Sequence, residues 1–185
     1  MTSLAMTSPA GVFKKLTVRE AAVLLALAWL VPFLVHLAPW SGARPLGAYL
    51  LPVFWATFVA VYFYGAVAGL LTGLLVPAIS LVMTGLPAWR AVGAMSLELI
   101  VFVLVTTWAV RRAPGFWLLA PLGYLVAKTV SALLLSAVTT LGSAAAAGHF
   151  LAHMLVGGAA GLVVLALING ALVKFYPKAG RPTGA

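Results

Sequence analysis

Long apolar runs alternate along the chain with short segments rich in proline, glycine or charge. The runs are about 20 residues long, which is what an α-helix needs to cross a ~30 Å hydrocarbon core. A transmembrane barrel strand would instead alternate apolar and polar residues over about 10 positions. The pattern therefore predicts an all-α integral membrane bundle of six transmembrane helices, over residues 19–38, 47–64, 66–84, 91–110, 116–136 and 149–174.

The breaks between the runs indicate the domain organisation. Residues 47–84 are too long for one span, so Gly65 is expected to separate two helices. Residues 139–148 are expected to form a connector that is partly helical. The expected parts are a cytoplasmic N-terminal tail over 1–17, one six-helix transmembrane domain over 18–175 and a basic cytoplasmic tail over 176–185.

Composition supports lipid as the solvent for most of the chain. Hydrophobic residues make up 64% and charged residues 7%, whereas soluble domains have roughly 45–50% apolar and 25% charged residues. Backbone groups in lipid need internal hydrogen-bond partners, which helices supply. The chain has no cysteine, which excludes disulfides and thiolate chemistry.

The basic residues predict the orientation of the helices. The net charge is +9, and Glu20 and Glu98 are the only acidic residues. Cytoplasmic chain ends follow from the positive-inside rule, since eight basic residues then lie inside and only Arg44 and Arg90 outside. Contact with anionic lipid headgroups accounts for the positive charge. The basic residues are scattered over the ends of the predicted helices, which argues against nucleic-acid binding. The inner residues are Lys14, Lys15, Arg19, Arg111, Arg112, Lys174, Lys178 and Arg181.

Small residues recur at helical spacing and predict close contacts between helices. Such faces let two backbones approach closely in lipid. Tight packing inside the bundle is the main expectation, and a docking face for another protein is the alternative. The sets are Gly65, Gly69 and Gly73, then Gly157 and Gly161, and Ala22 and Ala26.

Costly polar side chains are expected in the outer half of the bundle. Glu98 lies roughly 10 Å and Lys128 roughly 12 Å below the outer ends of their predicted helices, where an ionisable group costs roughly 2.5–3.5 kcal/mol. We expect the two at the floor of an outward-facing pocket; alternatively, they form an ion pair that only joins two helices. The other expected substrate-binding residues are Trp40, Arg44, Trp55, Arg90, Tyr124, His149, His153 and His36.

The histidine spacing raises the question of a metal. His149 and His153 are four residues apart, so their imidazoles can share a metal ion. No Glu accompanies them as in zinc-protease helices, so hydrogen bonding to a ligand is favoured and no metal or other cofactor is expected. Hydrolase elbows, phosphate-binding Gly-Lys loops and paired carboxylates are absent from the sequence. We therefore expect no enzyme activity, although three histidines and Glu98 leave acid–base chemistry open.

The chain resembles the substrate-capture (S) components of energy-coupling factor vitamin transporters over residues 16–175. The resemblance is carried by Ala22-xxx-Ala26, by Leu50-Leu51-Pro52, by the stretch from Tyr64 to Gly73, by Thr84-Gly85-Leu86-Pro87 and by the following helix with Glu98. It implies a prokaryotic plasma-membrane protein that binds a vitamin-like molecule from outside. It also implies docking, through Ala22 and Ala26, on a transmembrane coupling protein driven by two ATPase subunits.

Two other functions fit the same residues. A self-sufficient secondary transporter would use Glu98 or the histidines as a proton relay. A membrane scaffold subunit would use the polar groups only to hold helices together. The identity of the substrate does not follow from the resemblance.

Overall fold

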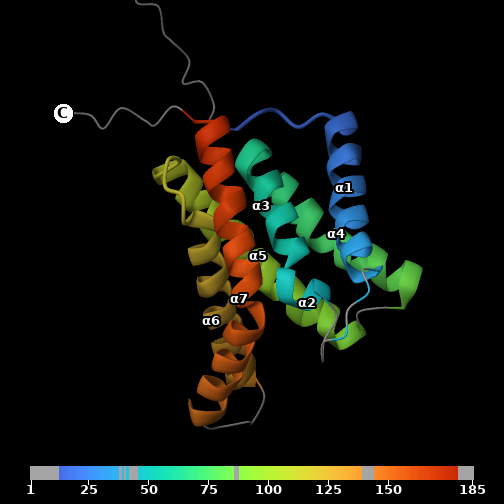
Figure 1. Ribbon diagram of the computed structural model, residues 1–185, viewed down its shortest axis with the longest axis vertical. Helices are drawn as coiled ribbons and strands as arrows, with labels where there is room; N and C mark the ends of the chain where they lie inside the picture. The colour runs from blue at the N-terminus through green and yellow to red at the C-terminus, as the bar shows by residue number, and fades with distance from the viewer. Residues whose placement is uncertain are drawn as a thin grey trace, which may run out of the picture.

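The computed structural model describes residues 13–37, 39, 41, 46–85, 88–138 and 144–178. A few side chains inside the helices, including those of His36, Arg90, His149 and His153, lie outside the description. The elements are helices, which confirms the all-α prediction. They are α1 (Val18–Leu37), α2 (Leu46–Leu50), α3 (Pro52–Tyr64), α4 (Ala66–Thr84), α5 (Trp89–Arg112), α6 (Leu119–Val138) and α7 (Ala144–Phe175) (Figure 1).

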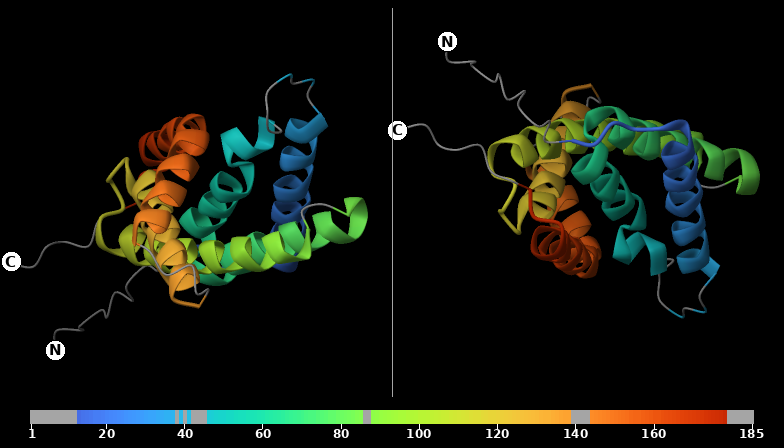
Figure 2. Two further views of the ribbon diagram at one scale, coloured as in Figure 1. Left: turned by 90° about the horizontal axis from the view of Figure 1, so that it is seen from below. Right: turned by 90° about the horizontal axis from the view of Figure 1, so that it is seen from above.

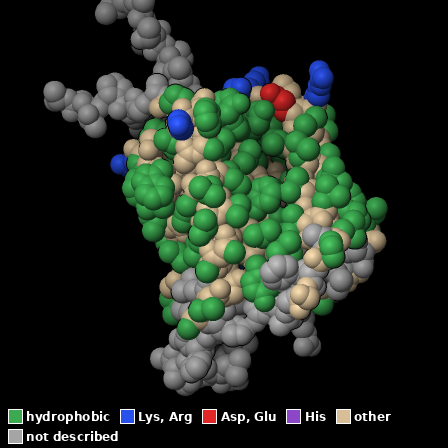
Figure 3. Space-filling model, viewed as in Figure 1, with side chains coloured by type: hydrophobic (Ala, Val, Ile, Leu, Met, Phe, Trp, Pro, Cys, Tyr) green, Lys and Arg blue, Asp and Glu red, His purple; other side chains and the backbone are tan. Residues whose placement is uncertain are grey.

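Within the part of the chain that the structure describes, four helices are long and apolar enough to cross a membrane. Their apolar windows are Val18–Val35, Ala66–Met83, Ala91–Arg112 and Val156–Phe175, while Pro52–Tyr64 and Leu119–Leu134 are shorter apolar helices. Hydrophobic side chains cover the flank of the molecule, and the charged side chains visible there gather toward one end (Figure 3). These features indicate a membrane protein.

Helix α3 holds the bundle together. It contacts α1, α4, α5, α6 and α7, and α1, α3 and α7 lie on one side of α4 and α5 when the bundle is viewed along its length (Figure 2). Phe58, Val61 and Tyr62 of α3 are fully buried. Helix α1 is peripheral, since only 11% of its apolar window is buried.

The apolar stretch 47–64 is two helices, so the prediction of one helix there is wrong. Leu51 has φ 54° and ψ 44°, which is the left-handed conformation, and it separates α2 from α3. Pro52 favours a break because it lacks an N–H donor and disfavours the right-handed α conformation at the residue before it. The indole N–H of Trp55 donates to the Leu50 carbonyl at 3.1 Å, which satisfies an acceptor at the end of α2.

The other boundaries are close to those expected from the sequence. Gly65, with φ 82°, separates α3 from α4 and confirms the predicted division. Helix α7 begins at Ala144, so residues 144–148 of the expected connector belong to it. The end of α4 is a left-handed Gly85 whose N–H donates to the Leu81 carbonyl, a common helix C-cap.

The glycine face of α4 packs inside the bundle, in line with the main expectation. A Cβ at Gly69 would lie 3.1 Å from Val103 of α5, and one at Gly73 would lie 3.4 Å from Thr57 Oγ1 of α3. On α7 close approaches are seen at Gly158 and at Gly161, and Gly161 belongs to the predicted pair. Both α7 glycines face Leu51, where α2 meets α3.

Candidate functional site

An ion pair joins α5 to α6 in the interior of the bundle. Lys128 Nζ donates to Glu98 Oε2 at 2.6 Å, and both side chains are only 9% exposed. Removing two charges from water costs several kcal/mol per ion, and their attraction offsets this only with good geometry and further hydrogen bonds. The two charged residues therefore form the ion pair that the alternative interpretation of the sequence describes.

Aromatic rings surround the ammonium group of Lys128. Its Nζ lies 5.6 Å from the ring centroid of Tyr124 and 6.0 Å from that of Phe54. These two rings pack edge to face, with centroids 4.9 Å apart at 87°. A cation over a desolvated aromatic face gains about 2 kcal/mol, so the two rings add to the attraction that Glu98 exerts on the ammonium group.

Two buried hydroxyl groups lie one helical turn from Lys128 and from Phe54. Ser131 lies one turn after Lys128 on α6, and Thr57 lies one turn after Phe54 on α3. Ser131 Oγ and Thr57 Oγ1 are buried without a hydrogen-bond partner among the described atoms. An unsatisfied buried polar group costs about 1–3 kcal/mol, so each is available to a water molecule or a ligand group.

The pair sits close to the middle of its helices. Lys128 falls midway along α6, which runs from Leu119 to Val138, and Glu98 lies in the first half of α5. Helix α6 extends two residues past its predicted outer end, which makes Lys128 deeper than the sequence suggested. The structure thus brings the charges together near the centre of the bundle.

The remaining predicted site residues divide into three groups. Tyr124 joins the pair, and Trp55 lies on the same helix as Phe54 with its N–H directed to Leu50. Trp40 and Arg44 lie outside the described residues, as do the side chains of His36, Arg90, His149 and His153. Ala22 and Ala26 are exposed on α1.

Phe54 and Thr57 are the site residues that sequence reasoning missed. Both lie in an unbroken apolar stretch, where an aromatic residue is ordinary core and a lone threonine hydrogen-bonds its own helix. The sequence offers only their spacing from Pro52 and Trp55. Without knowledge of the break at Leu51, that spacing does not show which face of the helix Phe54 and Thr57 occupy.

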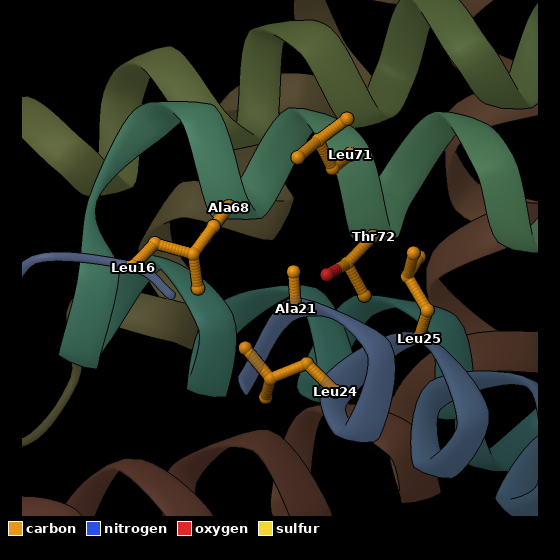
Figure 4. Close-up of a pocket in the computed structure, with 7 residues that line it drawn as sticks. All are labelled: Leu16, Ala21, Leu24, Leu25, Ala68, Leu71 and Thr72. Carbon is orange, nitrogen blue, oxygen red and sulfur yellow. The ribbon is translucent and has the colours of Figure 1, made fainter. Parts of the chain in front are cut away.

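A hollow lies between α1 and α4. It is lined by Leu16, Ala21, Leu24, Leu25, Ala68, Leu71 and Thr72, and its cavity volume is only about 10 Å³, room for about one water molecule (Figure 4). Pockets for small-molecule ligands typically enclose about 300–1,000 Å³ and combine apolar walls with several polar groups. This crevice offers only the Thr72 hydroxyl, so we interpret it as incomplete packing of the peripheral helix α1.

Comparison of the chain with models of known protein families, with curated proteins and with solved structures finds no match.

Proposed function

We propose that this chain is the substrate-capture subunit of an ATP-driven importer of vitamin-like small molecules in a prokaryotic plasma membrane. The observation that carries the proposal is the buried Glu98–Lys128 pair between the rings of Phe54 and Tyr124. Ionisable residues inside membrane segments are rare and often mark substrate or ion pathways. The neighbouring hydroxyls of Thr57 and Ser131 add hydrogen-bonding capacity that no described protein atom uses.

Six membrane spans form part of the proposal. Helices α2 and α3 together cover residues 46–64, and α6 covers 20 residues, which gives each a length near the ~30 Å of a hydrocarbon core. With six spans both chain ends lie on the side with more basic residues, the cytoplasm. Single cysteines at positions 14 and 111 test this topology. An impermeant thiol reagent is expected to label them in inverted vesicles and not in intact cells.

The ligand is proposed to engage the ion pair from the outer side, where α2 ends and α3 begins. Titration of co-purified or added small molecules compares wild type with Glu98→Gln and Lys128→Met. Lys174→Met is the matched control, because Lys174 lies exposed in the last turn of α7. We expect the two pair variants to bind the ligand with an affinity lowered by at least about tenfold, because each loses one charged contact. The control is expected to bind like wild type.

A double variant separates ligand binding from helix pairing. Glu98→Leu with Lys128→Met removes both charges and leaves no unpaired one, so the bundle is expected to stay folded. A folded double variant that no longer binds supports the capture function. A folded double variant that binds like wild type means that the pair only joins α5 to α6, and the capture function at this site is then rejected.

Docking on a transmembrane coupling protein, itself driven by two ATPase subunits, is proposed for α1. Its exposed surface includes Ala22 and Ala26, where small side chains permit close approach of another helix in lipid. Ala22→Leu and Ala26→Leu are expected to reduce co-purification with the coupling protein. Ala159→Leu on the exposed face of α7 is the matched control.

A proton-coupled secondary transporter is the second candidate. It is favoured by a carboxylate held beside a lysine deep in the bundle, since such groups act as proton relays in transporters. Uptake that follows an imposed pH gradient in vesicles without any ATPase subunit would support it. Uptake that requires ATPase subunits would support the capture subunit instead.

A further inference from the structure

A strained backbone position lies next to the candidate site. Leu51 is the only non-glycine residue with a positive φ in the described part of the chain, at φ 54° and ψ 44°. This left-handed conformation is unfavourable for a residue that carries a Cβ. Backbone strain persists only where the surrounding structure imposes it, and it clusters at functional sites. The strain at Leu51 therefore raises the question of what this residue holds in place.

Contacts with α7 impose the conformation of Leu51. Its side chain is half-buried and packs on the hydrophobic core. A Cβ at Gly158 would lie 3.6 Å from Leu51 Cδ1, and one at Gly161 would lie 2.6 Å from the same atom. The two glycines thus leave a notch in α7 that the Leu51 side chain fills. Outside this notch a residue before proline favours an extended backbone, and Pro52 follows Leu51 directly.

The conformation of Leu51 sets the direction in which α3 begins. The backbone N–H of Phe54 donates to the Leu51 carbonyl at 3.0 Å. The indole N–H of Trp55 donates to the Leu50 carbonyl at 3.1 Å, which ties the first turn of α3 to the end of α2. Since φ and ψ are the soft dihedrals of the backbone, a change at Leu51 would redirect this turn and move the Phe54 ring with it.

The rings beside Lys128 both depend on this part of the fold. The centroid of the Phe54 ring lies 4.9 Å from that of Tyr124 and 6.0 Å from Lys128 Nζ. The Tyr124 hydroxyl reaches the notch that Leu51 fills, since a Cβ at Gly158 would lie 3.0 Å from its oxygen. A lysine side chain has a flexible four-carbon stem. The position of the Lys128 ammonium group therefore depends on these rings as well as on Glu98.

We propose that Leu51 is a positioning residue, whose left-handed backbone holds Phe54 against Lys128 and so fixes the ammonium group beside Glu98. Leu51 acts through the first turn of α3, and the notch in α7 keeps it in its strained conformation. The proposal rests on the capture function in one respect, because it takes the Glu98–Lys128 pair as the ligand site.

The test compares Leu51→Ala with Leu51→Gly in the full chain in detergent. Both variants lose the side chain that fills the notch, but glycine adopts the left-handed conformation readily. The readout is the rate at which acetic anhydride acetylates Lys128, measured by mass spectrometry of peptides. We expect this rate to rise at least about tenfold in Leu51→Ala, the shift that the strain of one left-handed residue corresponds to. In Leu51→Gly we expect it to stay within about threefold of wild type.

Leu172→Ala is the matched control, because Leu172 is a buried leucine near the inner end of α7. It is expected to leave the acetylation rate of Lys128 like that of wild type. The measurement uses no ligand, so its outcome is separate from the titration that tests the capture function. A folded Leu51→Gly beside an unfolded Leu51→Ala would also support the role of the backbone conformation.

Four results would overturn the proposal. Acetylation in Leu51→Gly as fast as in Leu51→Ala would mean that side-chain packing, and not the left-handed backbone, holds the site. Failure of both variants to fold would mean the same. An equal rise in Leu172→Ala would mean a general loosening of the bundle. The wild-type rate in Leu51→Ala would mean that Leu51 does not hold Lys128 in place.

Discussion

Leu51 occupies the surface that Gly161 leaves open on α7. A Cβ at position 161 would lie 2.6 Å from Leu51 Cδ1 and 2.8 Å from the backbone oxygen of Tyr49. The break between α2 and α3 is thereby seated directly against another helix. The left-handed conformation of Leu51 costs about 1–2 kcal/mol for a residue with a side chain, and the close contact with α7 holds it in place.

Gly161→Ala is expected to destabilise the fold, since the added methyl group meets backbone as well as side chain. Overpacking of this kind costs typically about 1–3 kcal/mol. Gly170→Ala on the same helix is the matched control, because a Cβ there would meet no heavy atom of the described residues within 4 Å, apart from its chain neighbours and the backbone of its own helix. It is expected to be neutral or stabilising by about 0.4–1 kcal/mol. Thermal unfolding in detergent measures both, and equal unfolding temperatures for the two variants would contradict this contact.

The ion pair predicts strong non-additivity between its two members. Glu98→Leu or Lys128→Met alone leaves one buried charge without its partner, and each is expected to cost about 3–5 kcal/mol. The double variant leaves no buried charge and is expected to recover most of this loss. Unfolding temperatures of the four proteins in the cycle provide the measurement. Losses that add in the double variant would show that each residue acts separately.

The positions of most helices along the chain could be predicted from the sequence because lipid imposes one strong requirement, a continuous apolar run for each span. Glycine at residue 65 was readable as a boundary since a longer helix would not fit the bilayer. The left-handed Leu51 was not readable, because a non-glycine residue takes that conformation only when tertiary contacts, here with Gly161, enforce it.

The candidate site was predictable in part for the same reason. Charged residues are so costly in lipid that Glu98 and Lys128 were recognisable in the sequence as site residues, and each was the obvious partner of the other. Phe54 did not stand out, because a helix surrounded by protein and lipid is apolar on every face and shows no periodicity. The face that meets Lys128 is defined only by how α3 packs against α6.

Asn169 links α7 to the beginning of α6. Its Oδ1 accepts the backbone N–H of Ala120 and its Nδ2 donates to the Phe116 carbonyl, both at 3.1 Å. Asn169→Leu leaves a buried N–H without a partner and is expected to cost about 1–3 kcal/mol. Hydrogen exchange of the first turn of α6 should accelerate in this variant. Exchange unchanged from wild type, in a folded protein, would argue that these bonds do not hold the helix end.

The pH dependence of stability is expected to report on Lys178. Burial lowers its pKa from 10.5 to about 8, and its Nζ lies 4.4 Å from the ring centroid of Phe13 and 4.8 Å from that of Tyr62. Below pH 8 both folded and unfolded chains carry the proton, so the cost of the buried charge is fully present. Between about pH 8 and 10.5 the unfolded chain binds more protons, so the free energy of unfolding rises with pH.

Lys178→Met is expected to remove this rise, and Lys174→Met is expected to keep it because Lys174 is exposed. Unfolding temperatures measured from pH 7 to 10.5 in a zwitterionic detergent, without anionic lipid, provide the comparison. A slope that is the same in wild type and Lys178→Met would assign the pH dependence to other groups and contradict the burial of this charge.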